Sequence, residues 1–180
     1  MIRFLVRLAI NMAALAGLAI LAEAWLRRRA GGGAPESIRL RAVIRAPITR
    51  VWDELVDIEG QPRWMHDMKS VRMAGRPPYG VGSRGDATVR MYGISVNDPV
   101  RITEFVPPRR FAIAHEGLVA GGGRFDVEPG ADPNNTIVRW EERLGMPLLP
   151  HLGAGLAAPV FRHVFELDLE RFAKLVEGTS

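Results

Sequence analysis

Hydrophobic and polar positions alternate along residues 38–45, where Ile38, Leu40 and Ile44 are separated by mostly charged residues. A period of two is typical of a strand that buries one face. Similar short runs recur further along the chain, and turn-forming clusters such as residues 77–80 separate them. They predict six more strands, near residues 69–73, 84–92, 95–105, 111–116, 123–128 and 136–144. The pattern therefore predicts an antiparallel meander of seven strands.

Helical segments are predicted on either side of this meander. Residues 47–56 and 62–67 each begin with proline, which fits the first turn of a helix. Near the C-terminus, apolar side chains share one helical face, at Phe161, Phe165, Leu169, Phe172 and Val176. Pro159 is expected to start or kink this helix, with residues 148–158 as a loop or a shorter helical lead-in.

The N-terminus carries a separate apolar segment. Residues 8–22 are apolar apart from Asn11, and arginines flank them on both sides. Extended to residues 4–26, the segment is long enough to cross a hydrocarbon core of about 30 Å. We therefore expect residues 1–29 to form a single-pass anchor in the cell membrane. Because arginines flank both ends, the positive-inside rule does not decide on which side of the membrane the following domain lies. A cleaved signal peptide is the alternative, because Ala22-Glu23-Ala24 is an A-x-A-like site.

Residues 30–35 are rich in glycine and are expected to link this segment to a domain at residues 36–177. In that domain, two short proline-initiated helices follow one edge strand, and only strands and one long helix come after them. This order, carried by residues 46–57 and 61–64, resembles the SRPBCC (START-related, helix-grip) superfamily in its polyketide cyclase/dehydrase-like branch. The resemblance implies an α+β fold, in which a curved seven-stranded sheet grips the C-terminal helix around an apolar cavity. Such cavities hold lipids, sterols or polyketide-like molecules.

The composition narrows the partners. The chain has 24 basic and 20 acidic residues, but five basic residues and one acidic residue lie in residues 1–30, so the rest is electrically neutral. A neutral domain argues against nucleic-acid binding. The absence of cysteine excludes disulfides and thiolate sites, and the four histidines lack metal-ligand spacing. Residues 80–85 match G-x-G-x-x-G, but they lead into a strand rather than a helix, so we expect neither a metal nor a cofactor.

A few polar residues stand on apolar faces. Asp168 lies inside the apolar arc of the C-terminal helix, and its burial would require an arginine partner or a raised pKa. Glu142 alternates with Trp140, and His115 ends a strand on the same face as Phe111. A buried carboxylate beside His115 would supply the groups for acid–base chemistry. The arginines considered as partners of Asp168 are Arg84, Arg90 and Arg139. The predicted ligand-contacting residues are Trp64, Met91, Phe111, His115, Trp140, Glu142, Phe161, Phe165 and Asp168.

The favoured interpretation is a membrane-tethered binding or carrier domain for a hydrophobic small molecule, lipid or polyketide-like. The alternative is an enzyme of the cyclase, aromatase or dehydratase type, in which the polar cavity residues move protons. Whether the chain is an enzyme stays open at this point, and a third reading is an interaction module whose cavity is filled by side chains. Residues 118–123 are expected to form a hairpin tip with hinge-like glycines at the cavity entrance.

Overall fold

The computed structural model describes residues 2–32, 37–91, 93–145 and 149–178. The helices are α1 (Ile2–Arg29), α2 (Ile48–Val56), the 3-10 helix η1 (Ile58–Arg63) and α3 (Pro150–Glu177). The strands are β1 (Ile38–Ile44), β2 (Met68–Met73), β3 (Arg84–Met91), β4 (Ile94–Val106), β5 (Arg110–His115), β6 (Ala120–Pro129) and β7 (Thr136–Gly145).

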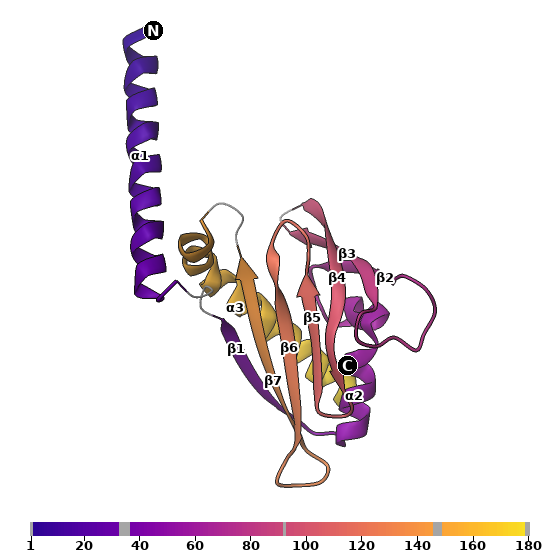
Figure 1. Ribbon diagram of the computed structural model, residues 1–180. Helices are drawn as coiled ribbons and strands as arrows, with labels where there is room; N and C mark the ends of the chain where they lie inside the picture. Colours follow the sequence, from indigo (N-terminus) through magenta and orange to yellow (C-terminus); the bar gives the residue numbers. More distant parts are fainter. Residues whose placement is uncertain (1, 33–36, 92, 146–148, 179–180) are drawn as a thin grey trace.

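The seven strands form one antiparallel sheet in the order β1-β7-β6-β5-β4-β3-β2. The sheet curves, and α3 crosses its concave face, while α2 closes one end of that face (Figure 1). Apart from the β1–β7 pair, each strand pairs with its neighbour in the chain, as a meander requires. The predicted α+β helix-grip architecture is confirmed.

The second short helix differs from the prediction. It begins at Ile58 rather than at Pro62, which lies inside it. The reason is the cap: the Asp57 side chain accepts a hydrogen bond from the backbone N–H of Gly60 at 3.2 Å, and this satisfies an N–H of the first turn. Proline position alone therefore misplaced the start of this helix.

Helix α3 is longer than the apolar pattern indicated. It is continuous from Pro150 and includes Pro159, so residues 150–158 of the segment predicted as a loop or shorter helical lead-in are helical. It ends at Gly178, whose φ of 74° is the left-handed conformation that glycine adopts without strain. Its buried side chains, from Asp168 to Val176, all lie in the second half of the helix.

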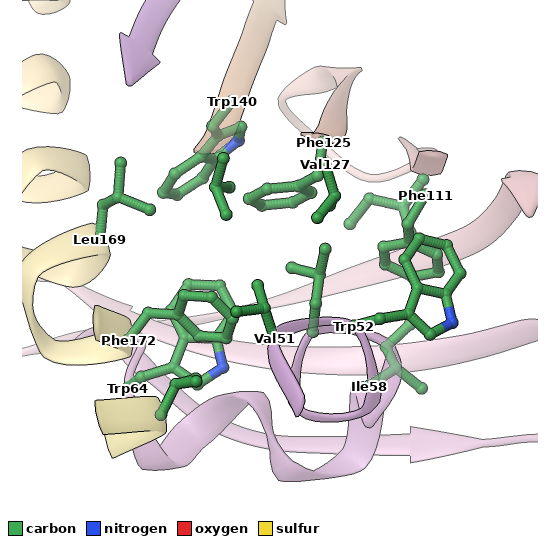
Figure 2. Close-up of a cluster of buried hydrophobic side chains, with 14 of the residues drawn as sticks. Val51, Trp52, Ile58, Trp64, Phe111, Phe125, Val127, Trp140, Leu169 and Phe172 are labelled. Atoms are coloured by element: carbon green, nitrogen blue, oxygen red, sulfur yellow. The ribbon is translucent and has the colours of Figure 1, made fainter. Parts of the chain in front are cut away.

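An aromatic cluster fills the space between α3, α2 and the centre of the sheet (Figure 2). Trp64 is 1% exposed and lies with its ring centroid 5.0 Å from that of Phe172 on α3. Phe125 and Trp140, on neighbouring strands, stack at 4.9 Å. Offset and edge-to-face ring pairs of this kind add to the stabilisation from burial. This part of the concave face is therefore a packed core.

The convex face of the sheet is covered with ion pairs. Arg110 of β5 contacts Asp126 of β6 at 2.7 Å, and Arg124 of β6 contacts Glu141 of β7 at 3.4 Å. These pairs cross adjacent strands on the solvent side, where each contributes little to stability but keeps the face soluble. The alternation of the strands is thus explained by an apolar concave face and a charged convex face.

Helix α1 extends away from the sheet (Figure 1). Within Phe4–Arg29, an 18-residue window has a mean hydropathy of 2.1, and none of that window is buried. Large side chains such as Leu8, Ile10 and Leu18 are about half exposed or more. By length and composition α1 is able to cross a membrane, a property that a signal sequence near an N-terminus shares.

Candidate functional site

Three ionisable side chains meet on the concave face, at the end of the sheet near the start of α3. His115 of β5 lies between two carboxylates: its Nδ1 is 2.6 Å from Oδ2 of Asp98 on β4, and its Nε2 is 3.2 Å from Oε1 of Glu142 on β7. We refer to Asp98, His115 and Glu142 as the acid–histidine cluster. It is the polar end of a face that is otherwise lined mostly by apolar side chains.

The strand register brings these residues together. His115 is opposite Val100 of β4, two residues beyond Asp98, so both side chains point to the same face. Glu142 belongs to β7, and β6 separates it from β5. Since neighbouring strands are about 4.8 Å apart, the backbones of β5 and β7 are about 10 Å apart here. A direct contact across β6 requires that β6 places no side chain in between.

Glycines in β6 meet this requirement. Gly121 pairs with His115, and Gly123 pairs with Glu142. A Cβ atom at Gly123 would lie 2.5 Å from Oε2 of Glu142. The expected hairpin tip with hinge-like glycines is therefore wrong for these residues, because they lie inside a strand and leave room for the cluster.

Glu142 is the most buried member, at 5% exposure, whereas Asp98 and His115 are 17% and 16% exposed. Its Oε2 accepts a hydrogen bond from the Trp140 indole N–H at 2.9 Å. Its Oε1 forms an ion pair with the imidazole at 3.2 Å, at an angle poor for a hydrogen bond, and no other described group donates to this oxygen. One buried carboxylate oxygen is thus available to a hydrogen-bond donor.

The two carboxylates determine the charge of His115. Burial alone would lower the pKa of the imidazole, but the hydrogen bond to Asp98 and the proximity of Glu142 raise its pKa to about 10. At neutral pH the ring is an imidazolium, and both nitrogens are directed at carboxylates. The cluster then contains one cation and two anions, so it suits a ligand group that donates hydrogen bonds.

Asp168 is buried on α3 but lies outside this cluster. Its Oδ1 accepts a hydrogen bond from the backbone N–H of His66 at 2.9 Å, and Arg171 is 3.9 Å away. Burial raises the pKa of the Asp168 carboxyl, while the His66 N–H acts in the opposite direction. Asp168 therefore joins α3 to the segment before β2. The buried carboxylate beside His115 is that of Glu142, not that of Asp168.

The arginines considered as partners of Asp168 do not fill that role. Arg84 pairs with Glu116 at 2.6 Å, and Arg139 pairs with Glu128, both among exposed groups. Arg90 is exposed on β3. The three arginines alternate with apolar residues because they lie on the charged convex face of the sheet, not because the concave face carries a polar patch.

The other predicted contact residues fall into two groups. Trp64, Phe111 and Trp140 are at most 2% exposed and belong to the packed core. Phe161 and Phe165 of α3 are half-buried and stack at 5.8 Å, and Phe165 lies 4.8 Å from the Trp140 ring. The side chain of Met91 lies outside the described residues.

Asp98 is the cluster residue that sequence reasoning missed. It lies in the run Ser95-Val96-Asn97-Asp98-Pro99, in which no alternation marks one face. In the structure Gly117 leaves room for Asp98, since a Cβ there would be 2.8 Å from the carboxylate. In the sequence, a glycine two residues after His115 does not point to Asp98, since turns also favour glycine.

A second concave feature lies at the sheet edge, between β1 and the second half of α3. This groove has a volume of about 400 Å³, and charged side chains such as Arg41, Arg162 and Glu166 line it beside Leu169. It is separate from the acid–histidine cluster. Within the described ranges, no group of three or more histidine and acidic residues is placed to hold a metal ion.

The curved sheet, the helix that crosses it and the polar end of the concave face define a START-like helix-grip protein. Residues 35–177 match the family described as polyketide cyclase / dehydrase and lipid transport, and the chain belongs to this family. The structure is similar to that of the Zhui aromatase/cyclase from Streptomyces sp. R1128, with a TM-score of 0.63 and 15% identity over 79% of this chain and 93% of that one.

Two further structures are similar. A START superfamily protein from Mycobacterium smegmatis has a TM-score of 0.60 and 18% identity, over 79% of this chain and 94% of that chain. A conserved protein from Geobacillus kaustophilus has a TM-score of 0.63 and 15% identity, over 80% and 97%. At these identities the likeness concerns the fold. No curated protein matches the sequence.

Proposed function

We propose that this protein is a membrane-tethered binding or carrier domain for a hydrophobic small molecule. The observation that carries the proposal is the acid–histidine cluster, which places a 95%-buried carboxylate at the end of an apolar concave face. A charge in such a place is costly unless it is paired or used. Here the ion pair with His115 leaves Glu142 Oε1 without a donor of good geometry, which supports a role in receiving a ligand.

The chemistry of the cluster suggests the kind of ligand. The apolar face would hold an aliphatic or aromatic body, and a hydroxyl or amine would donate to Glu142. A polar group at one end of an otherwise apolar site sets the orientation of a ligand. The family description, which includes lipid transport and polyketide cyclisation, agrees with ligands of this class.

Ligand entry would involve the first half of α3. The centre of the concave face is filled by side chains, whereas Phe161 and Phe165 are only half-buried, and Phe165 packs against Trp140, which donates to Glu142. Displacement of these two rings would open space between α3 and the sheet without disrupting the Trp64 core. We therefore place the ligand at this end of the helix.

The apolar helix α1 supports tethering. A hydrophobic ligand is concentrated in a bilayer, and a domain anchored there meets it at a high local concentration. The exposed apolar surface of α1 would be covered by lipid. Within this proposal, α1 is a single-pass anchor.

An enzyme of the cyclase or dehydratase type is the second candidate. The observation in its favour is the contact between an imidazole and a buried carboxylate, on a fold shared with an aromatase/cyclase. A general base should have a pKa near the working pH. His115, protonated and paired at both nitrogens, is a poor base at pH 7, and this favours binding over catalysis.

Native mass spectrometry with solvent extraction of the full chain tests the proposal. The protein would be purified gently in detergent, as wild type, as Glu142→Gln and as Glu128→Gln, a control on the convex face. We expect a stoichiometric hydrophobic molecule in the wild type and the control, and reduced occupancy in Glu142→Gln. Equal occupancy in all three would remove Glu142 from the site, and an empty wild type would refute the carrier function.

A further inference from the structure

Several exposed apolar side chains gather at the end of the molecule where the acid–histidine cluster lies. They are Ile94 at the β3–β4 turn, Leu118 at the β5–β6 turn and Leu156 in the first half of α3, which are 69%, 66% and 75% exposed. Figure 1 shows both turns and the start of α3 at the same end of the sheet. Single exposed apolar residues are common, but these three come from separate elements at the same end of the molecule, and we refer to them together as a surface.

A polar contact fixes α1 beside this surface. The Glu23 carboxylate of α1 accepts hydrogen bonds from the backbone N–H groups of His151 at 3.1 Å and Leu152 at 2.9 Å. It also lies 2.7 Å from the His151 imidazole. Helix α3 has no side-chain cap from its own N-cap residue, so Glu23 satisfies N–H groups that the start of a helix leaves unpaired. The favourable interaction of a carboxylate with the positive end of α3 strengthens this contact.

This contact determines where a bilayer around α1 would lie. Glu23 is only four residues before Arg27, which is about 6 Å along a helix. Arg27, Arg28 and Arg29 end α1, at the depth of lipid phosphates if the apolar part crosses the membrane. The start of α3 would then be at the level of the membrane surface. From there α1 extends away from the sheet, on the side to which both turns point (Figure 1).

We propose that this end of the domain docks on the bilayer that holds α1, with Ile94, Leu118 and Leu156 at the lipid interface. The proposal rests on the tether in the proposed function and goes beyond it, because a tether alone would let the domain tumble. The occupant is lipid rather than protein, since Glu23 joins this end of the domain to an apolar helix that ends in three arginines. The arginines suit anionic headgroups. The cluster and the half-buried rings of α3 would then face the membrane.

Spin labelling tests this arrangement directly, because the chain has no cysteine and each introduced one is unique. Single variants Ile94→Cys, Leu118→Cys and Leu156→Cys would be nitroxide-labelled in the full chain, in nanodiscs of phosphatidylcholine with a minority of phosphatidylglycerol. Collision rates with oxygen and with a water-soluble nickel complex report depth. Ile10→Cys on α1 is the reference for lipid, and Val106→Cys, 52% exposed at the opposite end of β4, is the reference for water.

We expect nickel accessibility at positions 94, 118 and 156 to be several-fold lower than at position 106, with higher oxygen accessibility. Labels as accessible to nickel as position 106, with position 10 in lipid, would overturn docking and leave the anchor intact. A water-exposed label at position 10 would overturn both. Spin–spin broadening at position 118 in nanodiscs loaded with several chains, relieved by dilution with unlabelled chain, would show a second copy on the surface and reject lipid as the occupant.

The Glu23 contact is tested in the same system. Glu23→Ala should raise nickel accessibility at positions 118 and 156 towards that of position 106, while position 10 stays in lipid. Glu170→Ala, which removes an exposed carboxylate from α3, is the matched control and should change nothing. Unchanged accessibility in Glu23→Ala would reject its role in orienting the domain.

Discussion

The raised pKa of His115 predicts a specific loss of stability at alkaline pH. The imidazole has a pKa of about 10 in the folded protein and about 6.5 in an unfolded chain. Because the folded-state value is the higher one, the stabilisation is fully present below pH 6.5 and is lost as the pH rises through 10. The perturbation is therefore a change of pH from 7 to 9, well inside this window.

The magnitude follows from the two pKa values. Over most of this range the folded protein holds one proton that the unfolded chain has released, so the free energy of unfolding falls by somewhat less than 1.4 kcal/mol per pH unit. Between pH 7 and 9 the decrease is about 2 to 3 kcal/mol. That is a large part of the stability of an ordinary domain.

The assay is urea unfolding of the full chain in detergent, followed by tryptophan fluorescence at pH 7, 8 and 9. The variant His115→Gln removes the titrating group, and His163→Gln, at an exposed position on α3, is the matched control. The control should keep the wild-type slope and His115→Gln should lose it. If wild type and His115→Gln decline in parallel, the cluster does not hold a proton in the way that its geometry indicates.

Three further predictions concern other parts of the site. Gly123→Val should lower the free energy of unfolding by about 1 to 3 kcal/mol, since the new side chain meets the Glu142 carboxylate. The control Gly155→Ala, in open space on α3, should be neutral or stabilising, and equal stability of the two variants would contradict the packing argument. Trp64→Ala should cost about 3 to 5 kcal/mol in urea unfolding, and a loss below 1 kcal/mol would show that the aromatic cluster is not a packed core. Asp168→Leu should lower the free energy of unfolding by about 1 to 3 kcal/mol, because it leaves the His66 N–H unpaired. Asp168→Asn keeps an acceptor and should lower it by less. The reverse order, measured by thermal unfolding, would reject the structural role of Asp168.

The fold could be predicted well because its signals are local. Alternation set the seven strands to within a few residues, and the spacing of Phe161, Leu169 and Phe172 identified the long helix. The error at η1 arose because a side-chain cap from Asp57 outweighed the preference of Pro62 for a first turn. Such a cap depends on three-dimensional geometry that the pattern does not encode.

The site could be predicted only in part, since its contacts are between distant positions. Faces on single strands were enough to select His115 and Glu142 as candidates. Their contact across β6 depends on which strand lies between them and on the register of Gly121 and Gly123. Asp98 was out of reach because the alternation fails around it. Asp168 was correctly placed inside the apolar arc, but its partner is a backbone N–H, which a pattern of side chains cannot predict.

The glycines of β6 have a consequence for the motion of the sheet. Residues 121–123 have no side chains to pack, so the end of this strand is held by its backbone ladder and by the His115–Glu142 contact that passes over it. That contact holds β5 and β7 together across β6. A ligand that draws Glu142 away from His115 would break this contact, and the free energy required to open the strand ends locally would fall. Hydrogen exchange at these amides would then record occupancy of the site, and uptake and release would be coupled to fraying of the sheet at that end.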